Sequence, residues 1–387
     1  FKNNVSRDAV SFLKLRASWG RNGNISVLNG YPYATTISLG NSWYQYNVEG
    51  VGSVLSSSPN GLPNPNLIWE TSEQTDLGLD ARFLNNRLTF GIDYYNKQTK
   101  DWLIGVTVPP ELGVSNTTIN AGRVLNEGVE FEIGWKDHVG DFSYSINANF
   151  AYNRNEVLSL PETTARITSS DASSTNYQVQ SAIEVGYPVW YMRGYKYAGM
   201  DAEGKPQFYN SEGKVSSSVG TEDLQFIGQG APKYNYGLNI NLAWKGLDFA
   251  LYGVGQGGNV IMPVMSRTGY KNDLKWYLDQ YKAGNTPSPK TVEGDYIYYS
   301  STANLFKGDF FRIKQLQLGY TLPSNITKKA AISALRFYVS LDDFFTFTSY
   351  PGLDPETAST NATSGAGLDW GSYPTMQKLV LGVNLTF

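Results

Sequence analysis

The sequence predicts an all-β protein, an antiparallel transmembrane β-barrel with long extracellular loops. Three observations lead to this prediction. Apolar and polar residues alternate over runs of about ten residues, aromatic residues stand at both ends of the apolar face, and tight turns alternate with long polar loops. A tilted strand of about 9–11 residues crosses the hydrocarbon core of a bilayer, and aromatic girdles mark its two interfaces.

The alternation is clearest in residues 233–245. One face of this segment holds aliphatic residues between aromatic ones, and the other face holds Asn, Gly, Ala and Lys. Soluble β-sandwiches also alternate, but their strands usually have about five or six residues and their buried faces do not keep aromatics for the ends. The long alternation therefore favours one face in lipid and one face in a wet lumen.

We predict twelve strands, connected by turns and loops of two kinds. The pair at 176–186 and 189–199 is included because the count of upward and downward strands demands it. The strands lie at about 9–19, 68–83, 87–103, 121–137, 141–157, 176–186, 189–199, 233–245, 247–257, 307–321, 334–347 and 376–387. The tight turns lie at 84–86, 137–141 and 245–247, and the long polar loops at 20–67, 159–175, 200–231, 258–306 and 348–375. This asymmetry is typical of short periplasmic turns and long extracellular loops.

Two local irregularities are predicted in addition. Outward residues shift by three positions between Ile313 and Leu316, which predicts a β-bulge near Lys314 or Gln315. In segment 271–283, Leu274, Leu278 and two tyrosines recur at helical spacing, which predicts a short helix on the outer rim.

Composition argues against most enzymes and against nucleic-acid binding. The chain has no cysteine, which excludes a thiolate metal site and a Cys nucleophile, and its single histidine, His138, leaves no Ser-His-Asp triad elsewhere and no multi-His metal site. The net charge of −3 gives no basic face for nucleic acid. Residues 253–258 match GxGxxG, but no helix follows them, so the dinucleotide-binding context fails. We expect no catalytic residues, no metal and no cofactor.

Aromatic residues in the long loops are the candidate substrate-binding residues. Flat aromatic faces stack on sugar rings or on peptide side chains. The alternative is that these rings pack loop against loop or contact a partner protein. The candidates are Trp43, Tyr44, Trp276, Tyr296, Tyr298 and Trp370.

Several long motifs resemble one known family. Segments 308–323 (GDFFRIKQLQLGYTLP), 335–356 and 373–387 are similar to the closing strands of SusC/RagA-type TonB-dependent outer-membrane transporters. Segments 66–103, 126–136, 185–200 and 232–258 fit the same family. The final residue, Phe387, resembles the C-terminal aromatic that the barrel-assembly machinery reads.

The resemblance implies a 22-strand barrel in the outer membrane of a Gram-negative bacterium, with a plug, a TonB box and a SusD-like surface lipoprotein as lid. It implies TonB-driven import of oligosaccharides or peptides. Residues 1–387 would be the C-terminal part of the barrel, strands 11–22. The plug, the TonB box, the signal peptide and the remaining barrel half are expected outside this chain. Its partners would be those parts, TonB, the lipoprotein and outer-membrane lipid.

Two alternatives remain open from the sequence. The first is a small closed barrel of twelve strands, in which segments 9–19 and 376–387 pair with each other. The second is a soluble secreted β-protein that binds carbohydrate. Backbone pairing between Leu15 and Leu381 would establish the closed barrel, whereas their separation would support the half-transporter.

Overall fold

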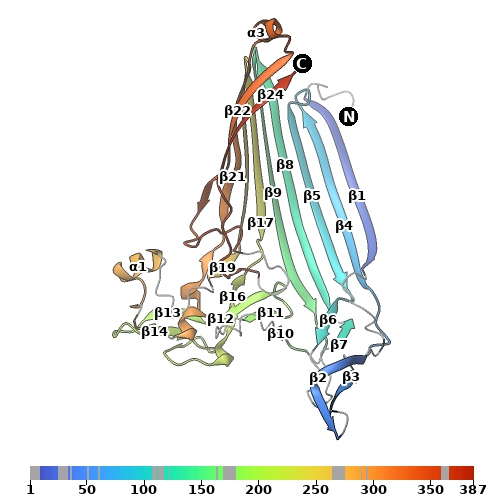
Figure 1. Cartoon of the computed structure of the whole chain (residues 1–387), viewed down its shortest axis with the longest axis vertical. Helices are drawn as coiled ribbons and strands as arrows, with labels where there is room; N and C mark the ends of the chain where they lie inside the picture. Colours follow the sequence, from blue (N-terminus) through green and yellow to red (C-terminus); the bar gives the residue numbers. More distant parts are fainter. Residues whose placement is uncertain are drawn as a thin grey trace.

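The computed structural model describes most of the chain. The described residues are 9–24, 34, 37–49, 52–59, 62–106, 111, 117–120, 122–162, 164–168, 180–263, 275–288, 290–292, 295–358 and 366–387. Their largest element is an antiparallel sheet of ten long strands, seen as the tall curved wall in Figure 1. In spatial order the strands are β1 (Val10–Asn24), β4 (Glu70–Phe83), β5 (Leu88–Lys100), β8 (Arg123–Val139), β9 (Phe142–Ser159), β17 (Tyr234–Trp244), β18 (Leu247–Gly257), β21 (Phe310–Thr321), β22 (Ala334–Thr348) and β24 (Lys378–Thr386).

The sheet is open within the described residues. β1 and β24 are the two edge strands of the sheet. β1 pairs with β4, and β24 pairs with β22. The alternative of a small closed barrel is therefore wrong. Leu15 pairs with Leu79, and Leu381 pairs with Val339, so the two edges do not meet.

The predicted count of twelve wall strands is too high by two. The described residues of the segments 176–186 and 189–199 do not join the wall, because β9 pairs directly with β17 from Phe142↔Trp244 to Tyr152↔Tyr234. They form instead the short strands β11 (Gln180–Ile183), β12 (Tyr191–Gly194) and β13 (Lys196–Met200). A strand of four residues spans only about 13 Å, too little for a membrane crossing. β9 runs away from a tight turn and β17 runs back towards one, so a single long loop joins them with the correct polarity.

The remaining strands belong to small sheets at the end of the wall where the long loops gather (Figure 1). A four-stranded sheet contains β10, β11, β12 and β16, and two three-stranded sheets contain β13–β14–β15 and β20–β19–β23. Two hairpins, β2–β3 and β6–β7, complete the set. The bounds are β2 (Ile37–Val48), β3 (Gly52–Pro59), β6 (Leu103–Val106), β7 (Thr117–Asn120), β10 (Ile167–Thr168), β14 (Pro206–Tyr209), β15 (Val215–Ser216), β16 (Gln225–Gln229), β19 (Val260–Pro263), β20 (Phe306–Lys307) and β23 (Leu368–Asp369).

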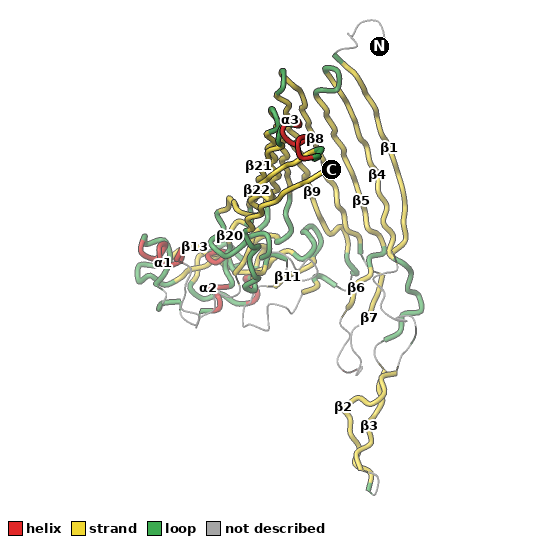
Figure 2. The backbone as a smooth tube through the Cα atoms, turned by 45° about the horizontal axis from the view of Figure 1, so that its top comes forward, coloured by secondary structure: helices red, strands yellow, loops and turns green. Residues whose placement is uncertain are grey.

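The helices are short. Helix α1 (Lys275–Lys282) confirms the helix predicted in 271–283, and it lies with α2 (Tyr296–Tyr299) among the loops (Figure 2). Helix α3 (Ser324–Thr327) lies at the opposite end, between β21 and β22. Single 3₁₀ turns are η3 (Thr221–Asp223), η4 (Thr302–Asn304) and η5 (Lys328–Ala330). Among the residues that the structure describes, none of the helices has the length and apolar character needed to span a bilayer.

The long loops pack into a domain with apolar cores of its own. One core contains Met192, Ile227, Met262 and Leu368, and another is built around Tyr195 and Phe208. Met192 and Met262 are fully buried, and they come from loops separated by two strands of the wall. We call this unit, formed from the described residues within 160–233, 258–309 and 349–377, the loop domain.

The predicted bulge is confirmed. Gln315 pairs with Tyr252, and Ile313 pairs with Gly253, so Lys314 is the extra residue on β21. The pairing with β22 shifts at the same place, where Asp343 adopts a φ of 57°. The outward residues of β21 therefore regain the outer face at Leu316.

Candidate functional site

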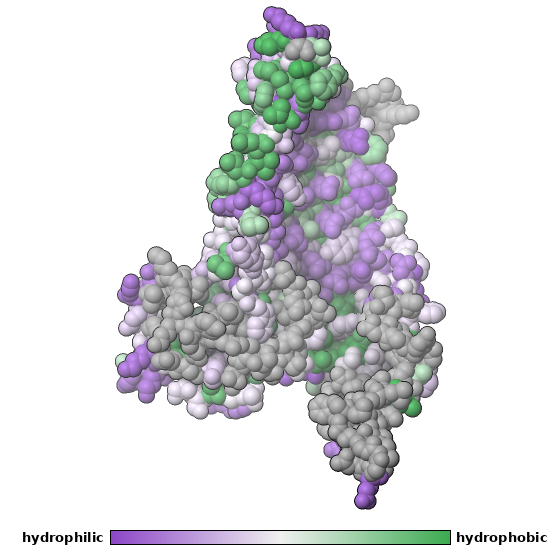
Figure 3. Space-filling model, in the orientation of Figure 1, coloured by the Kyte–Doolittle hydropathy of each residue, from purple (hydrophilic) through white to green (hydrophobic). Residues whose placement is uncertain are grey.

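Strand alternation divides the ten-stranded wall into two chemically different faces. On β17, Leu238 and Ile240 lie on one face, and Asn239 and Asn241 lie on the other. Figure 3 shows hydrophilic side chains gathered in the hollow of the sheet. We call the polar face the inner wall and the apolar face the outer wall.

Aromatic residues border the outer wall at both ends. Strand register places Phe142, Trp244, Tyr320 and Phe337 near the tight turns, and Tyr94, Tyr152 and Tyr234 near the loop domain. The 11 residues of β17 connect the two borders. At about 3.4 Å per residue and a tilt of about 40–45°, they cover about 25 Å along the membrane normal. This height equals the apolar band of an outer-membrane barrel.

On β9 and β17, the described strands with an aromatic residue at each border, charged residues appear on the outer wall only beyond the border near the loop domain. Arg154 lies two residues beyond Tyr152, and it contacts Glu127 at 2.9 Å and also Glu156. Lys100 contacts Glu73 at 2.7 Å at the same level of the neighbouring strands. The strands therefore project beyond the hydrocarbon core on the side of the loop domain.

The centre of the inner wall is lined with amides. Asn147 and Asn239 face each other across β9 and β17, and Asn149 faces Gly237. The Asn241 side chain donates to the Asn239 side-chain oxygen at 2.8 Å. Amides both donate and accept hydrogen bonds, so this surface suits cargo rich in hydroxyl or peptide groups.

A charged group crosses the inner wall near its β1 edge. Arg16 on β1 donates to Asp80 at 2.9 Å and to Asp93 at 2.8 Å. Asp93 belongs to β5, so the arginine reaches over β4, where Gly78 stands. A Cβ on Gly78 would come within 2.1 Å of the Asp93 carboxylate. The glycine therefore allows the bridge between β1 and β5.

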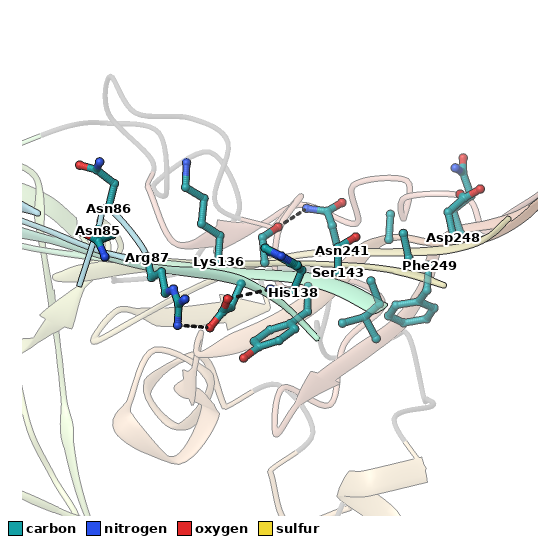
Figure 4. A pocket seen from close by; sticks show the side chains of 16 residues that line it. Asn85, Asn86, Arg87, Lys136, His138, Ser143, Asn241, Asp248 and Phe249 are labelled. Atoms are coloured by element: carbon teal, nitrogen blue, oxygen red, sulfur yellow. Dashed lines mark hydrogen bonds and ion pairs between the residues drawn. The ribbon is translucent and has the colours of Figure 1, made fainter. Parts of the chain in front are cut away.

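A hollow of about 730 Å³ lies where the inner wall approaches the tight turns (Figure 4). Lys136, Asn241 and Asp248 line it and project to the same side of the sheet in Figure 4. At its edge Arg87 contacts Asp137 at 3.0 Å. This hollow has the volume of a small-ligand site, and it presents hydrogen-bonding groups to whatever fills the lumen.

A buried ion network attaches the loop domain to the inner wall. Arg312 on β21 contacts Asp354 at 2.5 Å and Glu356 at 2.5 Å, and its side chain is 4% exposed. Lys314, the bulge residue, contacts Glu356 at 2.8 Å and Asp343 at 3.1 Å. Because Phe311 and Ile313 occupy the outer wall, Arg312 projects inwards. The segment that follows β22 therefore folds over the inside of the barrel mouth.

Further hydrogen bonds hold the segment that follows β22 in place. The Asp354 carboxylate accepts hydrogen bonds from the backbone N–H groups of Thr375 and Glu356, both at 2.9 Å. Burial raises the pKa of this carboxyl, but the Arg312 guanidinium and these N–H groups outweigh it and hold the pKa below its ordinary value. The Tyr350 hydroxyl donates to Asp369 at 2.5 Å. Burial and this hydrogen bond raise the pKa of Tyr350, so it stays a neutral donor.

The six candidate aromatics do not form one cluster in the described residues. Tyr296 and Trp370 lie in the loop domain and are 40% and 38% exposed. Tyr298 is 1% exposed, because it packs in the core with Tyr195, Phe208 and Val292. The side chains of Trp43, Tyr44 and Trp276 lie outside the described residues. Their backbones belong to β2 and α1, which stand far apart at the mouth in Figures 1 and 2.

Sequence reasoning missed two groups in this region. The first is the Arg312 network, whose members lie within the motifs 308–323 and 335–356. The second is an aromatic stack in which Tyr187 lies 4.7 Å from Tyr191 and 5.5 Å from Phe226 between ring centroids. Charged residues at inward positions beside a bulge were the available signal for the first group. The aromatic spacing gave no comparable signal for the second.

Together, the apolar outer wall with two aromatic borders, the polar inner wall and the loop domain define part of a transmembrane β-barrel of the outer membrane. The family comparison agrees with this class. Residues 8–340 match the family described as "TonB dependent receptor-like, beta-barrel". The chain belongs to this family, whose members are receptors and transporters rather than enzymes, and it is located in the outer membrane of a Gram-negative bacterium.

Similar proteins cover the whole chain. It is 29% identical to "TonB-dependent receptor P3" of Formosa agariphila over 100% of the chain and 40% of that protein. It is 28% identical to "TonB-dependent receptor SusC" of Bacteroides thetaiotaomicron over 98% of the chain and 38% of that protein. Among solved structures, "Structure of the RagAB peptide transporter" matches with a TM-score of 0.81 and 25% identity, over 100% of this chain and 42% of the other. The chain thus spans about two fifths of the relatives that it matches.

Proposed function

We propose that this chain is the C-terminal part of a barrel that imports oligosaccharides or peptides across the outer membrane. The remaining strands and a plug complete the lumen, TonB supplies energy through the plug, and a SusD-like lipoprotein covers the mouth. The observation that carries the proposal is the polar inner wall beneath a packed loop domain. The likeness to SusC and to the RagAB peptide transporter supports the same conclusion.

The inner wall supports an uncharged or weakly charged hydrogen-bonding cargo. Its centre is made of amides, and Arg16 is already bound to two carboxylates. Sugars and peptide backbones both offer hydroxyl or amide groups at short spacing. Tyr296 and Trp370 are the exposed candidates in the loop domain that could stack on such a cargo.

The test uses the intact protein that contains this chain. Binding and growth are measured on a panel of oligosaccharides and peptides, with wild type, Tyr296→Ala and Trp370→Ala. Tyr209→Ala is the matched control, because Tyr209 is also on the loop domain and is 39% exposed. Weaker binding of one substrate class by both variants, with normal assembly and an unaffected control, supports the proposal. Absence of binding and growth on every member of both classes by the wild type would overturn it.

Phe387 has a separate role in the proposal, as the signal for barrel assembly. It follows β24 and is 85% exposed, so its ring is available to the assembly machinery. Phe387→Ala should lower the amount of folded protein in the outer membrane without changing the substrate affinity of the molecules that do assemble. Unchanged assembly would contradict this role.

A further inference from the structure

The connection between β21 and β22 differs from the other tight turns of the wall. Residues 322–333 contain α3 and η5, whereas β8 and β9 are joined at 140–141 and β17 and β18 at 245–246. This turn, Leu322–Ser333, contains Lys328 and Lys329 and has no acidic residue. Both lysines are exposed, and neither forms an ion pair with a described residue. We call this segment the basic turn.

Apolar and aromatic side chains lie within and beside the basic turn. Ile326, within the turn, is 54% exposed. Tyr320 near the end of β21 and Phe337 near the start of β22 pair in register at the aromatic border. Figure 3 shows hydrophilic atoms at this tip beside hydrophobic side chains. Lysines next to an interfacial aromatic row lie at the height of lipid headgroups.

The neighbouring turn adds to the same surface. The Thr321 N–H donates to the Gly246 carbonyl at 2.8 Å, so the β17–β18 turn lies directly beside the start of the basic turn. Lys245 in that turn lies over the Trp244 ring at 5.6 Å, and its nearest described carboxylate partner is Asp141 at 3.7 Å. This part of the border therefore carries three lysines, of which Lys245 has a described carboxylate partner.

We propose that the basic turn binds anionic phospholipid headgroups of the periplasmic leaflet, such as phosphatidylglycerol, and anchors this side of the barrel in the membrane. Charge complementarity carries the assignment, because two exposed lysines without a described ion-pair partner stand beside an exposed isoleucine, a combination that suits a headgroup and the upper acyl region. Basic residues near an anionic leaflet each favour binding by about five-fold at low salt, and the effect falls within a Debye length. The inference is independent of which cargo the barrel carries.

The test measures lipid selectivity of the intact protein that contains this chain. Wild type and K328Q/K329Q are placed in nanodiscs of phosphatidylethanolamine with a minor fraction of spin-labelled phosphatidylglycerol, and the label immobilised by the protein is compared. The double variant should reduce the preference for phosphatidylglycerol several-fold, and added salt should reduce it in the wild type. K282Q/K290Q, which removes two exposed lysines from the loop domain, should leave the preference unchanged.

Heat-modifiable migration on gels verifies that all variants are folded barrels. An equal preference for phosphatidylglycerol in wild type and K328Q/K329Q would overturn the proposal. So would a loss of preference that is just as large in the control variant. If the lipid preference is unchanged but a periplasmic protein no longer co-purifies with K328Q/K329Q, the basic turn binds protein, and the proposal is wrong.

Discussion

Placing an arginine on β17 tests the division of the wall into lipid and lumen faces. Leu238 lies near the middle of the span between Tyr234 and Trp244, with Ala148 and Gly253 as register neighbours on the outer wall. Leu238→Arg puts a charge near the bilayer midplane, which costs about 2–4 kcal/mol, whereas the same change near an interface costs about 0–1 kcal/mol. Asn239→Arg is the matched control, since Asn239 is the next residue and faces the inner wall.

The assay is urea unfolding of the intact protein in liposomes, followed by heat-modifiable gel migration. We expect Leu238→Arg to lower the free energy of unfolding by about 2–4 kcal/mol or to block insertion. Asn239→Arg should lower it by less than about 1 kcal/mol, and Trp244→Arg, at the interface, should lower it by about 0–1 kcal/mol. Equal losses for Leu238→Arg and Asn239→Arg would refute the assignment of the faces, because the two side chains would then lie in the same environment.

Three further predictions concern the loop domain. Arg312→Ala leaves Asp354 buried without its counter-charge, which should cost about 3–5 kcal/mol and expose residues 349–377 to protease, whereas Lys282→Ala should not. Because folding lowers the pKa of Asp354, the contribution of this carboxylate to stability is present above the ordinary carboxyl pKa and is lost as the pH falls through the pKa of the folded state. The protease sensitivity of residues 349–377 should therefore rise only in acid. Tyr298→Ala should destabilise the loop domain by about 3–5 kcal/mol, as expected for a buried aromatic, whereas Tyr296→Ala should not; equal melting of both variants would contradict the assignment of Tyr298 to the core.

The wall could be predicted from the sequence because its signal is local. Alternation with period two depends on neighbouring residues, so the faces of β17 and the bulge at Lys314 can be read from short segments. The error at 176–199 has the same origin. Short strands alternate too, and only the direct pairing of β9 with β17 shows that this segment belongs to the loop domain.

The loop domain could not be predicted, since its contacts join distant segments. Arg312 and Asp354 are 42 residues apart, and neither shows its partner in the local pattern. Tyr296 and Tyr298 look equivalent in a polar loop. Because α2 turns by about 100° per residue, one ring faces solvent and the other enters the core with Phe208. A sequence that shows no helix at this place gives no means of separating them.

The edges of the wall give a physical reason for a larger barrel. Within the described residues no further strand pairs with the free side of β1 or of β24, and Leu15 and Leu381 place these edges at the level of the hydrocarbon core. An unsatisfied backbone group in lipid costs several kcal/mol. About half of the backbone groups of a nine-residue edge strand point outwards, so two such edges would exceed the net stability of a typical domain, about 5–15 kcal/mol. The inner wall also indicates a larger barrel, because its polar surface is stable only in contact with water or protein. Further strands that pair with β1 and β24 satisfy both requirements at once, and they close the lumen that the proposed import needs.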